Sequence, residues 1–470
     1  MPLFREENFL IIHTGSKHTL FSFGLQDTLS PPQYKLPTVV YLDKSTNVYH
    51  ASNTGNLAEI WPVRASRIVD VKAYQALLKF ILQTIISQYP ILTINQVPLL
   101  LIVPSLSYSR SAIEQITRYV FETLEFTAFN VLDLSIASTF GLATMSSAVV
   151  VNVGHESSQI MPVIGGTSIK HAGKRLEIGG KSITDELRKL LPHLSEAQIT
   201  ALKISKIYEV LSDHTESFYS LDDLKEKKSN QGDDFDVAKL VTEENQNGIG
   251  VSDEKADGEE EEEENEEDKK PNSQLDKNWF KDPISGNKIY VGKERFQGTD
   301  KLVDVLATSI YDSLRGIPDL EKRQECFDNI IFTGSTFHIE GLKQAVIIKL
   351  CERHLVRPQS TEKGSKGGQN GVNSAIAAYQ QTEEAAEETK SAGPLQNPSS
   401  VRSAKCPEYF PEWKRPKEHG GSWLDVYFLG GQIYSKQVFG TNSNHGGDSF
   451  IDTDIYEERG PQAIWDVVLS

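Results

Sequence analysis

The sequence predicts an α/β protein with two related halves, and two observations carry this prediction. Residues 9–23 and residues 148–166 each predict a β-hairpin, with an apolar strand, a tight turn that contains glycine, and a returning strand. Between and after these hairpins, apolar strands alternate with segments of helical periodicity, as an α/β sheet requires. A strand that ends in a small-residue turn leaves backbone amides free to face a phosphate, so the repeated hairpin indicates a duplicated nucleotide clamp. Either hairpin taken alone is more often an ordinary structural hairpin.

The first part of the chain is rich in predicted strands. Residues 9–42 predict a β-meander, and the apolar run at 97–103 predicts a buried strand. Between them, residues 69–87 carry apolar side chains at helical spacing, and Asp70 is a suitable N-cap. The alternation continues with a helix at 111–124 and a third element at about 132–142.

Two helices are predicted after the second hairpin. Within residues 176–191, two glycines end a strand, and Ser182 or Thr184 can cap a helix that runs to Pro192. A further helix is predicted over residues 195–211.

Ordered structure is predicted to resume at Ile289, with a helix from Lys301 to about Leu314. Residues 329–350 predict a strand, a turn of small residues and a helix, which is the layout of a nucleotide cradle and also of a routine βα unit. Residues 426–429 predict an apolar strand before the closing segment at 455–467.

Two segments are predicted to be disordered insertions, because they lack the apolar residues that a core requires. They are residues 213–276, which are acidic, and residues 358–405, which are rich in Gly, Ser, Gln, Ala and Glu. The run at 253–268 holds twelve acidic residues and one lysine, so most of the net charge of −17 comes from this run. No basic face for nucleic acid is evident elsewhere, which argues against direct sequence-specific DNA binding and leaves DNA to be reached through partners.

The cysteine content and the termini indicate an intracellular protein. Cys326, Cys351 and Cys406 are far apart and too few for a disulfide framework, which favours a reducing compartment. The N-terminal residues lack a signal-peptide pattern, and the longest apolar runs are too short to span a bilayer. We therefore expect a soluble protein with no membrane partner.

Several motifs together resemble the actin family, in the order that the family has them. They are PLLLIVPS and VFETL within 98–124, the hairpin at 149–166, IGGKSITDEL at 178–187, VGKERF at 291–296, and GGQIYSKQ at 430–437 with YEERGP at 456–461. The resemblance implies the fold of actin, hexokinase and the 70 kDa heat-shock ATPases, with two pseudo-symmetric α/β halves around a cleft for ATP and a divalent cation. The small half would hold residues 1–147 and 424–470, and the large half residues 148–423. The connection between Leu42 and Tyr49 is shorter than the subunit-contact loop of actins, which argues against a filament-forming cytoskeletal protein.

The implied cleft departs from the family pattern at the residues that carry its chemistry. The first hairpin has His13 for a metal-side Asp, Lys17 for a Gly and Leu20 for the phosphate-binding Lys. The second has Asn152 and His155 for two Asp residues and Glu156 for a Gly. Gln159 replaces a water-positioning His, and Leu134 replaces a catalytic Gln. The residues left at the nucleotide positions are Thr14, Gly15, Ser16, Asn152, Gly154, Gly334 and Ser335.

These replacements predict a degenerate cleft with no catalytic residues, no metal and no cofactor. Mg²⁺ prefers carboxylate oxygens, which imidazole and carboxamide replace poorly. A phosphate chain without lysine also loses a charge-assisted hydrogen bond of about 1.5–3 kcal/mol. ATP hydrolysis depends on positioned charges and a metal ion, and the residues that would supply them are replaced here. The alternative is a nucleotide-binding ATPase with divergent phosphate loops, in which Lys17 supplies charge and ATP binds without metal.

Within the family, the likeness is greatest to the nuclear actin-related proteins of the fungal SWI/SNF and RSC chromatin-remodelling complexes. It lies in LRKLLP at 187–192, KIYEVLSD at 206–213, PEYFPEWK at 407–414 and FLGGQIYSKQVF at 428–439. The resemblance implies a non-enzymatic structural subunit in the nucleus. Its partners would be actin-related protein 7 and the helicase-SANT-associated helix of the remodeller ATPase, with chromatin reached indirectly.

The family also suggests where a partner helix binds. In actins a groove between the halves accepts amphipathic helices, and by position it would be lined here by Phe140, Met145, Ile169, Tyr434, Val438 and Phe439. We expect the residues from Tyr434 to Phe439 to be exposed, since they follow a glycine pair. The alternative is that these side chains belong to the core.

Overall fold

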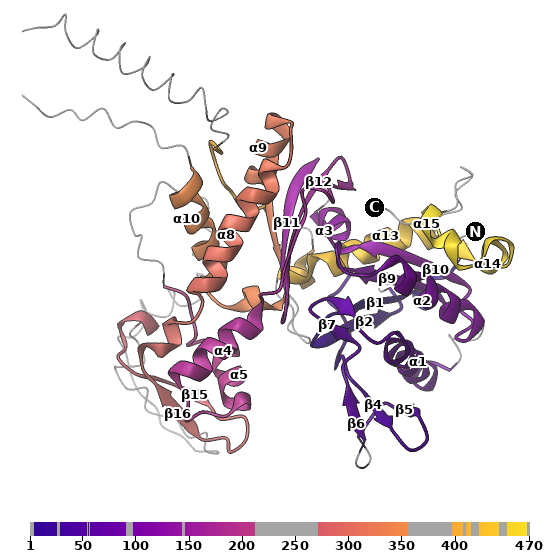
Figure 1. Cartoon of the computed structure of the whole chain (residues 1–470), viewed down its shortest axis with the longest axis horizontal. Helices are drawn as coiled ribbons and strands as arrows, with labels where there is room; N and C mark the ends of the chain where they lie inside the picture. Colours follow the sequence, from indigo (N-terminus) through magenta and orange to yellow (C-terminus); the bar gives the residue numbers. More distant parts are fainter. Residues whose placement is uncertain are drawn as a thin grey trace, which may run out of the picture.

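The computed structural model describes residues 4–467 with gaps. Residues 26–28, 54, 56, 91–96, 143–145, 212–270, 356–396, 408–409, 415–422 and 441–448 lie outside the described residues. Most of both predicted insertions and Met145 therefore lie outside them as well. The predicted α/β architecture of two halves is confirmed: two sheets stand side by side, each covered by helices (Figure 1).

The small half is built on a six-stranded sheet with the order β18-β10-β9-β1-β2-β3. Strands β1 (Leu10–Thr14), β9 (Pro98–Val103) and β10 (Ala128–Asp133) run parallel, in agreement with the predicted alternation of strand and helix. The sheet is completed by the antiparallel strands β2 (His18–Phe23), β3 (Tyr34–Pro37) and β18 (Ile451–Asp452).

Both faces of this sheet are buried, because helices pack against each of them. Successive side chains of a strand point to opposite faces. Leu99 and Leu101 share a core with α1 (Val71–Gln88) and α2 (Arg110–Glu122). Leu100 and Ile102 share another core with α3 (Leu134–Leu142) and α13 (Val426–Gly440). This arrangement explains why the strand at 98–103 reads as one continuous apolar run.

The large half is built on a five-stranded sheet in which β11 (Ser147–Val153) lies between β12 (Ser158–Ile164) and β17 (Ile330–Thr333). Val149, Val151 and Val153 of β11 face one core with the helices of this half. Those helices are α4 (Gly180–Leu190), α5 (Glu196–Ile204), α8 (Asp300–Arg315), α9 (Leu320–Asp328) and α10 (Leu342–His354). The short strands β13 (Thr167–Ser168) and β14 (Lys174–Leu176) pair with β12.

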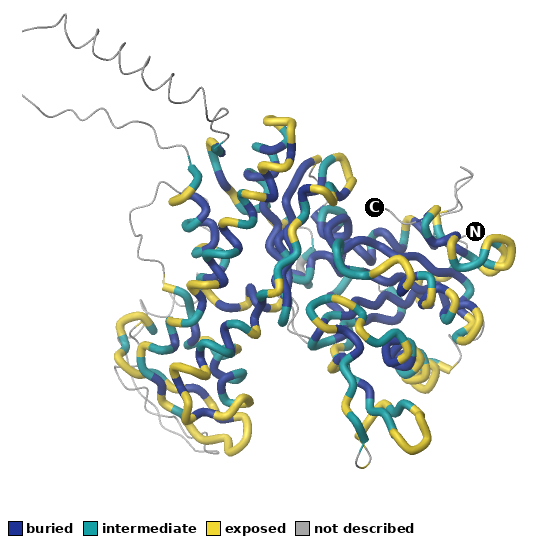
Figure 2. Tube along the Cα trace, viewed as in Figure 1, coloured by how far each residue is buried: buried dark blue, intermediate teal, exposed yellow. Residues whose placement is uncertain are grey.

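A single core joins the halves. It contains Leu100 of the first sheet and Val150 and Ile331 of the second, and α3 and α13 pass between them (Figure 1). Figure 2 shows that the buried residues are continuous across this junction. The two helices approach closely at Gly430, where a Cβ atom would lie 1.7 Å from the carbonyl oxygen of Ala137.

The strand predicted at 426–429 is wrong, because these residues begin helix α13. A short apolar run does not distinguish a buried strand from a buried helix. Here the following residues through Gly440 continue the helix, and its side chains are buried on nearly all sides.

Other predicted boundaries shift by a few residues. Helix α1 has the predicted cap, since Asp70 accepts a hydrogen bond from the Ala73 amide. The cap predicted for α4 is wrong: the helix begins at Gly180, and the hydroxyl of Ser182 donates back to the Gly179 carbonyl. Helix α5 is capped by Ser195 and ends at Ile204, short of the predicted Leu211.

Order extends into both predicted insertions. Residues 272–274 form a 3₁₀ turn, and strand β15 (Asn278–Lys281) pairs with β16 (Lys288–Val291) before the predicted resumption at Ile289. Residues 397–405 are also described, and Val401 of this stretch is buried in the large-half core.

The remaining elements lie at the edges of the small half. Strands β4 (Val40–Asp43), β5 (Val48–His50) and β6 (Ala58–Ile60) form a small sheet, and β7 (Val63–Arg64) pairs with β8 (Arg67–Ile68). The chain closes with α14 (Thr453–Arg459), a 3₁₀ turn η7 (Gly460–Ala463) and α15 (Ile464–Val467). None of the helices in the described parts of the chain has the length and apolar composition needed to cross a membrane.

Candidate functional site

The turns of the two predicted hairpins face each other between the halves. Each turn is closed by a backbone hydrogen bond, from the Gly15 amide to the His18 carbonyl and from the Gly154 amide to the Ser157 carbonyl, both at 3.0 Å. Burial and, to a smaller extent, the charge of Lys17 in the first turn lower the pKa of His155 in the second turn to about 4. The two turns are therefore near enough for the charge of one to act on the other.

On the large-half side, the structure brings several predicted residues together. Gly334 has a φ of +97°, and a Cβ atom on it would lie 2.7 Å from the Asn152 side-chain oxygen and 2.4 Å from the Val153 carbonyl. The Gly154 carbonyl accepts bonds from the Gly180 amide and from the Thr336 hydroxyl, each 2.9 Å long. A side chain at position 334 would clash with the backbone of β11, so this position requires glycine. The hydrogen bond from the Gly180 amide holds the start of α4 against the second turn. Ser335 follows on the exposed side and begins the turn η5 (Ser335–His338).

On the small-half side, the predicted residues are enclosed. Thr14 is fully buried, its hydroxyl accepts a 3.2 Å bond from the Tyr74 hydroxyl, and its carbonyl accepts one of 3.3 Å from Tyr108. Ser16 is buried as well. A Cβ atom on Gly15 would lie 2.9 Å from the His18 carbonyl, so this turn is tight.

His13 is a buried neutral histidine. Its Nδ1 lies 3.0 Å from the Ile102 carbonyl, and its ring packs 4.7 Å from the ring of Tyr427. Burial lowers the pKa of His13 to about 4, although the hydrogen bond to Ile102 acts in the opposite direction. At neutral pH Nδ1 therefore carries the proton and donates it to the carbonyl. This ring is part of the core and does not replace a metal-side carboxylate.

The other replaced positions are also occupied by structural contacts. Leu134 is buried in the core at the start of α3. Gln159 is buried, its Oε1 accepts a 3.3 Å bond from the Leu106 amide, and its Nε2 donates to the Ser107 hydroxyl. Within the described residues, no three His, Cys, Asp or Glu side chains are grouped to hold a metal ion.

Glu156 has a role that the sequence does not reveal. Its carboxylate accepts a 2.8 Å bond from the Ala65 amide and lies 3.1 Å from the Arg64 guanidinium, both in the β7–β8 turn of the small half. Beside it, the hydroxyls of Ser66 and Ser157 lie 2.6 Å apart. Ala65 and Ser66 both have positive φ, a backbone conformation that side-chain composition did not indicate. We call this set of contacts the Glu156 latch.

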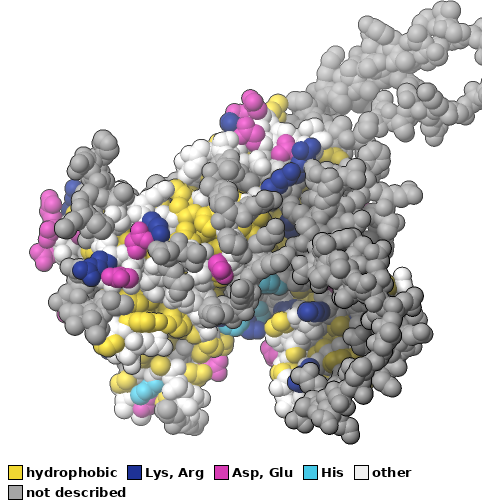
Figure 3. Space-filling model, turned by 180° about the vertical axis from the view of Figure 1, so that it is seen from behind, with side chains coloured by type: hydrophobic (Ala, Val, Ile, Leu, Met, Phe, Trp, Pro, Cys, Tyr) yellow, Lys and Arg dark blue, Asp and Glu magenta, His cyan; other side chains and the backbone are white. Residues whose placement is uncertain are grey.

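Positive charge gathers in the same cleft. Lys203 donates to the Gly180 carbonyl at 2.8 Å and to the Thr184 hydroxyl at 2.9 Å. Burial and, to a smaller extent, the charge of Lys17 lower the pKa of Lys203 to about 8. Viewed from behind, histidine and Lys or Arg side chains are visible in the notch between the two lobes (Figure 3).

Two carboxylates of the region, the buried Asp133 and the half-buried Asp425, were not predicted from the sequence. Burial raises the pKa of Asp133, whose oxygen accepts bonds from the Ser105 hydroxyl at 2.7 Å and the Ser135 amide at 2.8 Å. Burial also raises the pKa of Asp425, which accepts a 3.2 Å bond from the Tyr427 hydroxyl. The position of Asp133 at the end of a parallel strand is a signal that could have identified it.

The predicted exposure of the partner-binding residues is wrong for α13. Tyr434, Val438 and Phe439 are buried, with exposed fractions of 5%, 8% and 0%. The Tyr434 hydroxyl accepts a 3.0 Å bond from Asn130, and the rings of Phe4, Phe9 and Phe450 surround Phe439. The predicted groove at these residues is filled by the chain's own aromatic side chains.

Two other predicted groove residues remain half-buried. Phe140 packs edge to face against Tyr434, with the ring centroids 5.7 Å apart. Ile169 is half-buried and directly follows β13, a strand that contacts α3. These two side chains retain accessible surface near the junction of the halves.

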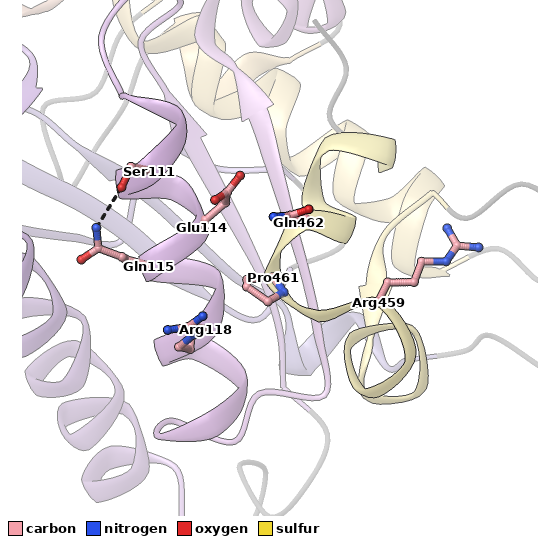
Figure 4. Close-up of a pocket in the computed structure, with 7 residues that line it drawn as sticks. All are labelled: Ser111, Glu114, Gln115, Arg118, Arg459, Pro461 and Gln462. Atoms are coloured by element: carbon pink, nitrogen blue, oxygen red, sulfur yellow. Dashed lines mark hydrogen bonds between the residues drawn. The ribbon is translucent and has the colours of Figure 1, made fainter.

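A separate surface pocket of about 400 Å³ lies between α2 and the C-terminal turn η7 (Figure 4). Its polar groups are largely engaged within the protein: Gln115 donates to Ser111 at 3.1 Å, and Glu114 accepts from the Trp465 indole at 2.9 Å. None of its lining residues belongs to the hairpin turns. They are Ser111, Glu114, Gln115, Arg118, Arg459, Pro461 and Gln462.

Comparison with known proteins places these features in context. The family model described as Actin matches residues 5–361. The SWI/SNF and RSC complexes subunit arp9 of Schizosaccharomyces pombe is 23% identical, and the alignment covers 99% of this chain and 99% of that protein. The actin-like protein ARP8 of Saccharomyces cerevisiae is 31% identical over 90 residues, which is 19% of this chain and 10% of that protein.

Proposed function

Because the chain belongs to the actin family, we propose that it is a non-enzymatic structural subunit of an ATP-dependent chromatin-remodelling complex and acts in the nucleus. The observation that carries this proposal is the similarity to the fission-yeast arp9 subunit along 99% of both chains. The likeness to actin-related proteins of the SWI/SNF and RSC complexes, predicted from the sequence, is confirmed by this comparison. Since a shared fold alone does not fix function, the cleft has to be considered separately.

The chemistry of the cleft supports a structural role. ATP hydrolysis in this fold depends on positioned charge and a metal ion. Here His13 is neutral and buried in the core, and the side chains of Leu134 and Gln159 are held by packing and hydrogen bonds. In the Glu156 latch, the second turn supplies a carboxylate that binds the β7–β8 turn and so joins the two halves.

We further propose that the chain pairs with a second actin-related protein, actin-related protein 7, on a helix of the remodeller ATPase. The half-buried surface of Phe140 and Ile169 is the part of the predicted groove that can receive apolar anchors of such a helix. Tyr434, Val438 and Phe439 would support this surface from the core side.

The partner proposal is tested by co-purification. The Phe140→Asp variant should lose the remodeller ATPase from its purified complex, because an unpaired charge in an apolar contact costs several kcal/mol. Ile204→Asp is the matched control, since Ile204 is 77% exposed on the large half and should leave the association unchanged. Mass spectrometry should identify an ATPase and a second actin-related protein with the unaltered chain. Recovery of the unaltered chain as a lone monomer would contradict the proposed role in a complex. Retention of the ATPase by the Phe140→Asp variant would contradict the proposed binding surface.

A nucleotide-binding role is the second candidate, and the cations of the cleft are the observation that favours it. Lys17 and Lys203 lie near His155 at the second turn. They could hold the phosphates of a nucleotide without metal. A thermal-shift titration with ATP separates the two candidates, with little rise in melting temperature expected for the structural subunit. A steady-state assay with Mg²⁺ and ATP tests for hydrolysis, with no turnover above background expected for that subunit. Turnover comparable to that of actin would contradict the structural proposal.

A further inference from the structure

The β15–β16 hairpin carries an outward face of two aromatic and two basic side chains. In its register Trp279 lies opposite Tyr290, and Lys281 lies opposite Lys288. The intervening Phe280 faces inward and is buried. Trp279 and Tyr290 are 38% and 62% exposed, which is unusual for rings of this size on one short hairpin. We call these four outward residues the hairpin face.

Among the described residues, Lys281 and Lys288 of the hairpin face form no ion pair with a carboxylate. Two lysines directly opposite each other on paired strands repel, and Lys288 is placed with its ammonium 4.1 Å from the centre of the Trp279 ring. The nearest carboxylate in the turn, Asp282, accepts bonds from the Ser285 hydroxyl at 2.6 Å and the Ile284 amide at 3.0 Å. Asp282 is therefore committed to shaping the turn. A face with this chemistry is suited to an anionic chain that offers many carboxylates.

The structure also fixes where the acidic part of the chain returns to the fold. Asn272 is held by the buried Arg295, whose Nε donates to its side-chain oxygen at 3.0 Å, and by Asn278, whose Nδ2 donates to the same atom at 2.8 Å. Arg295 also donates to the carbonyls of Asn272 and Gly292, at 2.7 and 2.6 Å. The chain that follows the acidic run is thus anchored directly beside the hairpin.

We propose that the hairpin face binds an acidic polypeptide segment, and that its occupant is the acidic run of this same chain, residues 253–268. The run has twelve carboxylates and one lysine, and its last residue, Asp268, precedes Trp279 by only a short stretch of sequence. A short tether gives an effective concentration in the millimolar range, so even a weak contact between the run and the face is populated. The inference does not depend on the proposed role in a remodelling complex.

The test uses the full chain in which residues 253–268 are replaced by a Gly/Ser segment of equal length. A fluorescein-labelled peptide with the sequence of 253–268 is titrated onto this protein, and binding is followed by anisotropy. We expect saturable binding that weakens as salt is raised, because exposed charges are screened. Lys281→Glu/Lys288→Glu should weaken the peptide affinity at least about tenfold. Lys72→Glu/Lys79→Glu on α1, with the same change in charge at two exposed lysines, should leave the affinity unchanged.

Two further measurements decide the assignment. The unaltered chain should bind the labelled peptide at least about tenfold more weakly than the Gly/Ser chain, because its own run competes for the face. Trp279→Ala/Tyr290→Ala should weaken peptide binding while the thermal transition stays in place. Absence of peptide binding, equal binding by the unaltered chain, or equal loss in both charge-reversal variants would overturn the proposal. Tighter binding of a single-stranded oligothymidylate than of the peptide would assign the face to nucleic acid instead.

Discussion

The carboxylate of Glu156 accepts a 2.8 Å hydrogen bond from the backbone amide of Ala65 and thereby joins turns that belong to different halves of the molecule. The same turn is held from the large half by Arg175, whose guanidinium donates to the Ala65 carbonyl at 2.6 Å. Both polar groups of one peptide turn are thus satisfied by the opposite half. The side chains of Glu156 and Arg175 therefore hold this turn of the small half against the large half.

Glu156→Ala should therefore destabilise the protein by about 1–3 kcal/mol, because it leaves the Ala65 amide without its charged acceptor. The ion pair with Arg64 adds little, since that guanidinium is half exposed. Equilibrium denaturation measures the loss. Glu177→Ala is the matched control: its carboxylate is 72% exposed and pairs with Arg175, so a change below about 0.5 kcal/mol is expected. Equal losses in the two variants would show that the latch adds nothing beyond a surface ion pair.

His13 should make the free energy of unfolding depend on pH. Its pKa is about 4 in the folded protein and 6.5 when unperturbed, so between these values the unfolded chain binds more protons. The contribution of His13 is fully present above pH 6.5 and is lost as the pH falls toward 4, up to about 3 kcal/mol. In His13→Gln, denaturation curves across this window should show a smaller loss with falling pH. An unchanged dependence would assign the titration to other groups, such as His18 and His155.

Gly430→Ala should be severely destabilising, because its Cβ would lie 1.7 Å from the Ala137 carbonyl oxygen in the tightest contact between α13 and α3. We expect a loss of at least about 3 kcal/mol, as for other overpacked core positions. Gly440→Ala, at the end of the same helix, meets no atom within 4 Å and should have little effect. Thermal unfolding of the two variants provides the comparison. If the Gly430→Ala protein melts at the same temperature as the unaltered chain, α13 and α3 can move apart without a loss in the free energy of unfolding.

Removal of residues 360–395 should leave the cooperative unfolding transition intact, since this stretch lacks apolar content and the closure entropy of a surface loop changes slowly with length. Extending the deletion to 403 should destabilise the large half. The Arg402 carbonyl accepts from the Ile330 amide at 3.0 Å, and Val401 is buried in the core. Circular dichroism during heating distinguishes the two deletions. Equal melting temperatures would contradict the role of Val401 and Arg402.

Most helices and strands of the fold could be predicted from local features of the sequence, such as cap residues, apolar spacing and turn glycines. Asp70 and the spacing of apolar residues predicted α1 and its cap, and the turn glycines predicted both hairpins. The strand predicted at 426–429 became helix α13, because a helix buried on all sides has no polar face to reveal its period. Likewise, Tyr434 and Phe439 could not be identified as core residues, since their partners Asn130 and Phe9 are remote in sequence.

The candidate site was predictable only in part for the same reason. The sequence indicated which family residues were replaced, and Asn152, Gly154 and Gly334 do lie together. The latch could not be predicted, because it depends on the positive φ of Ala65 and Ser66 and on contacts between residues about ninety positions apart. Such pairings are properties of the assembled halves and leave no periodic pattern in either segment.

The position of Asn272 bears on how the stretch 212–270 can vary in length. Its Nδ2 donates to the Ile207 carbonyl and to the Glu209 carboxylate, each at 2.8 Å. The chain segments just before and just after residues 212–270 are therefore held together at Asn272. Because both ends of the stretch 212–270 are held at neighbouring positions, a change in its length need not move a strand of either sheet.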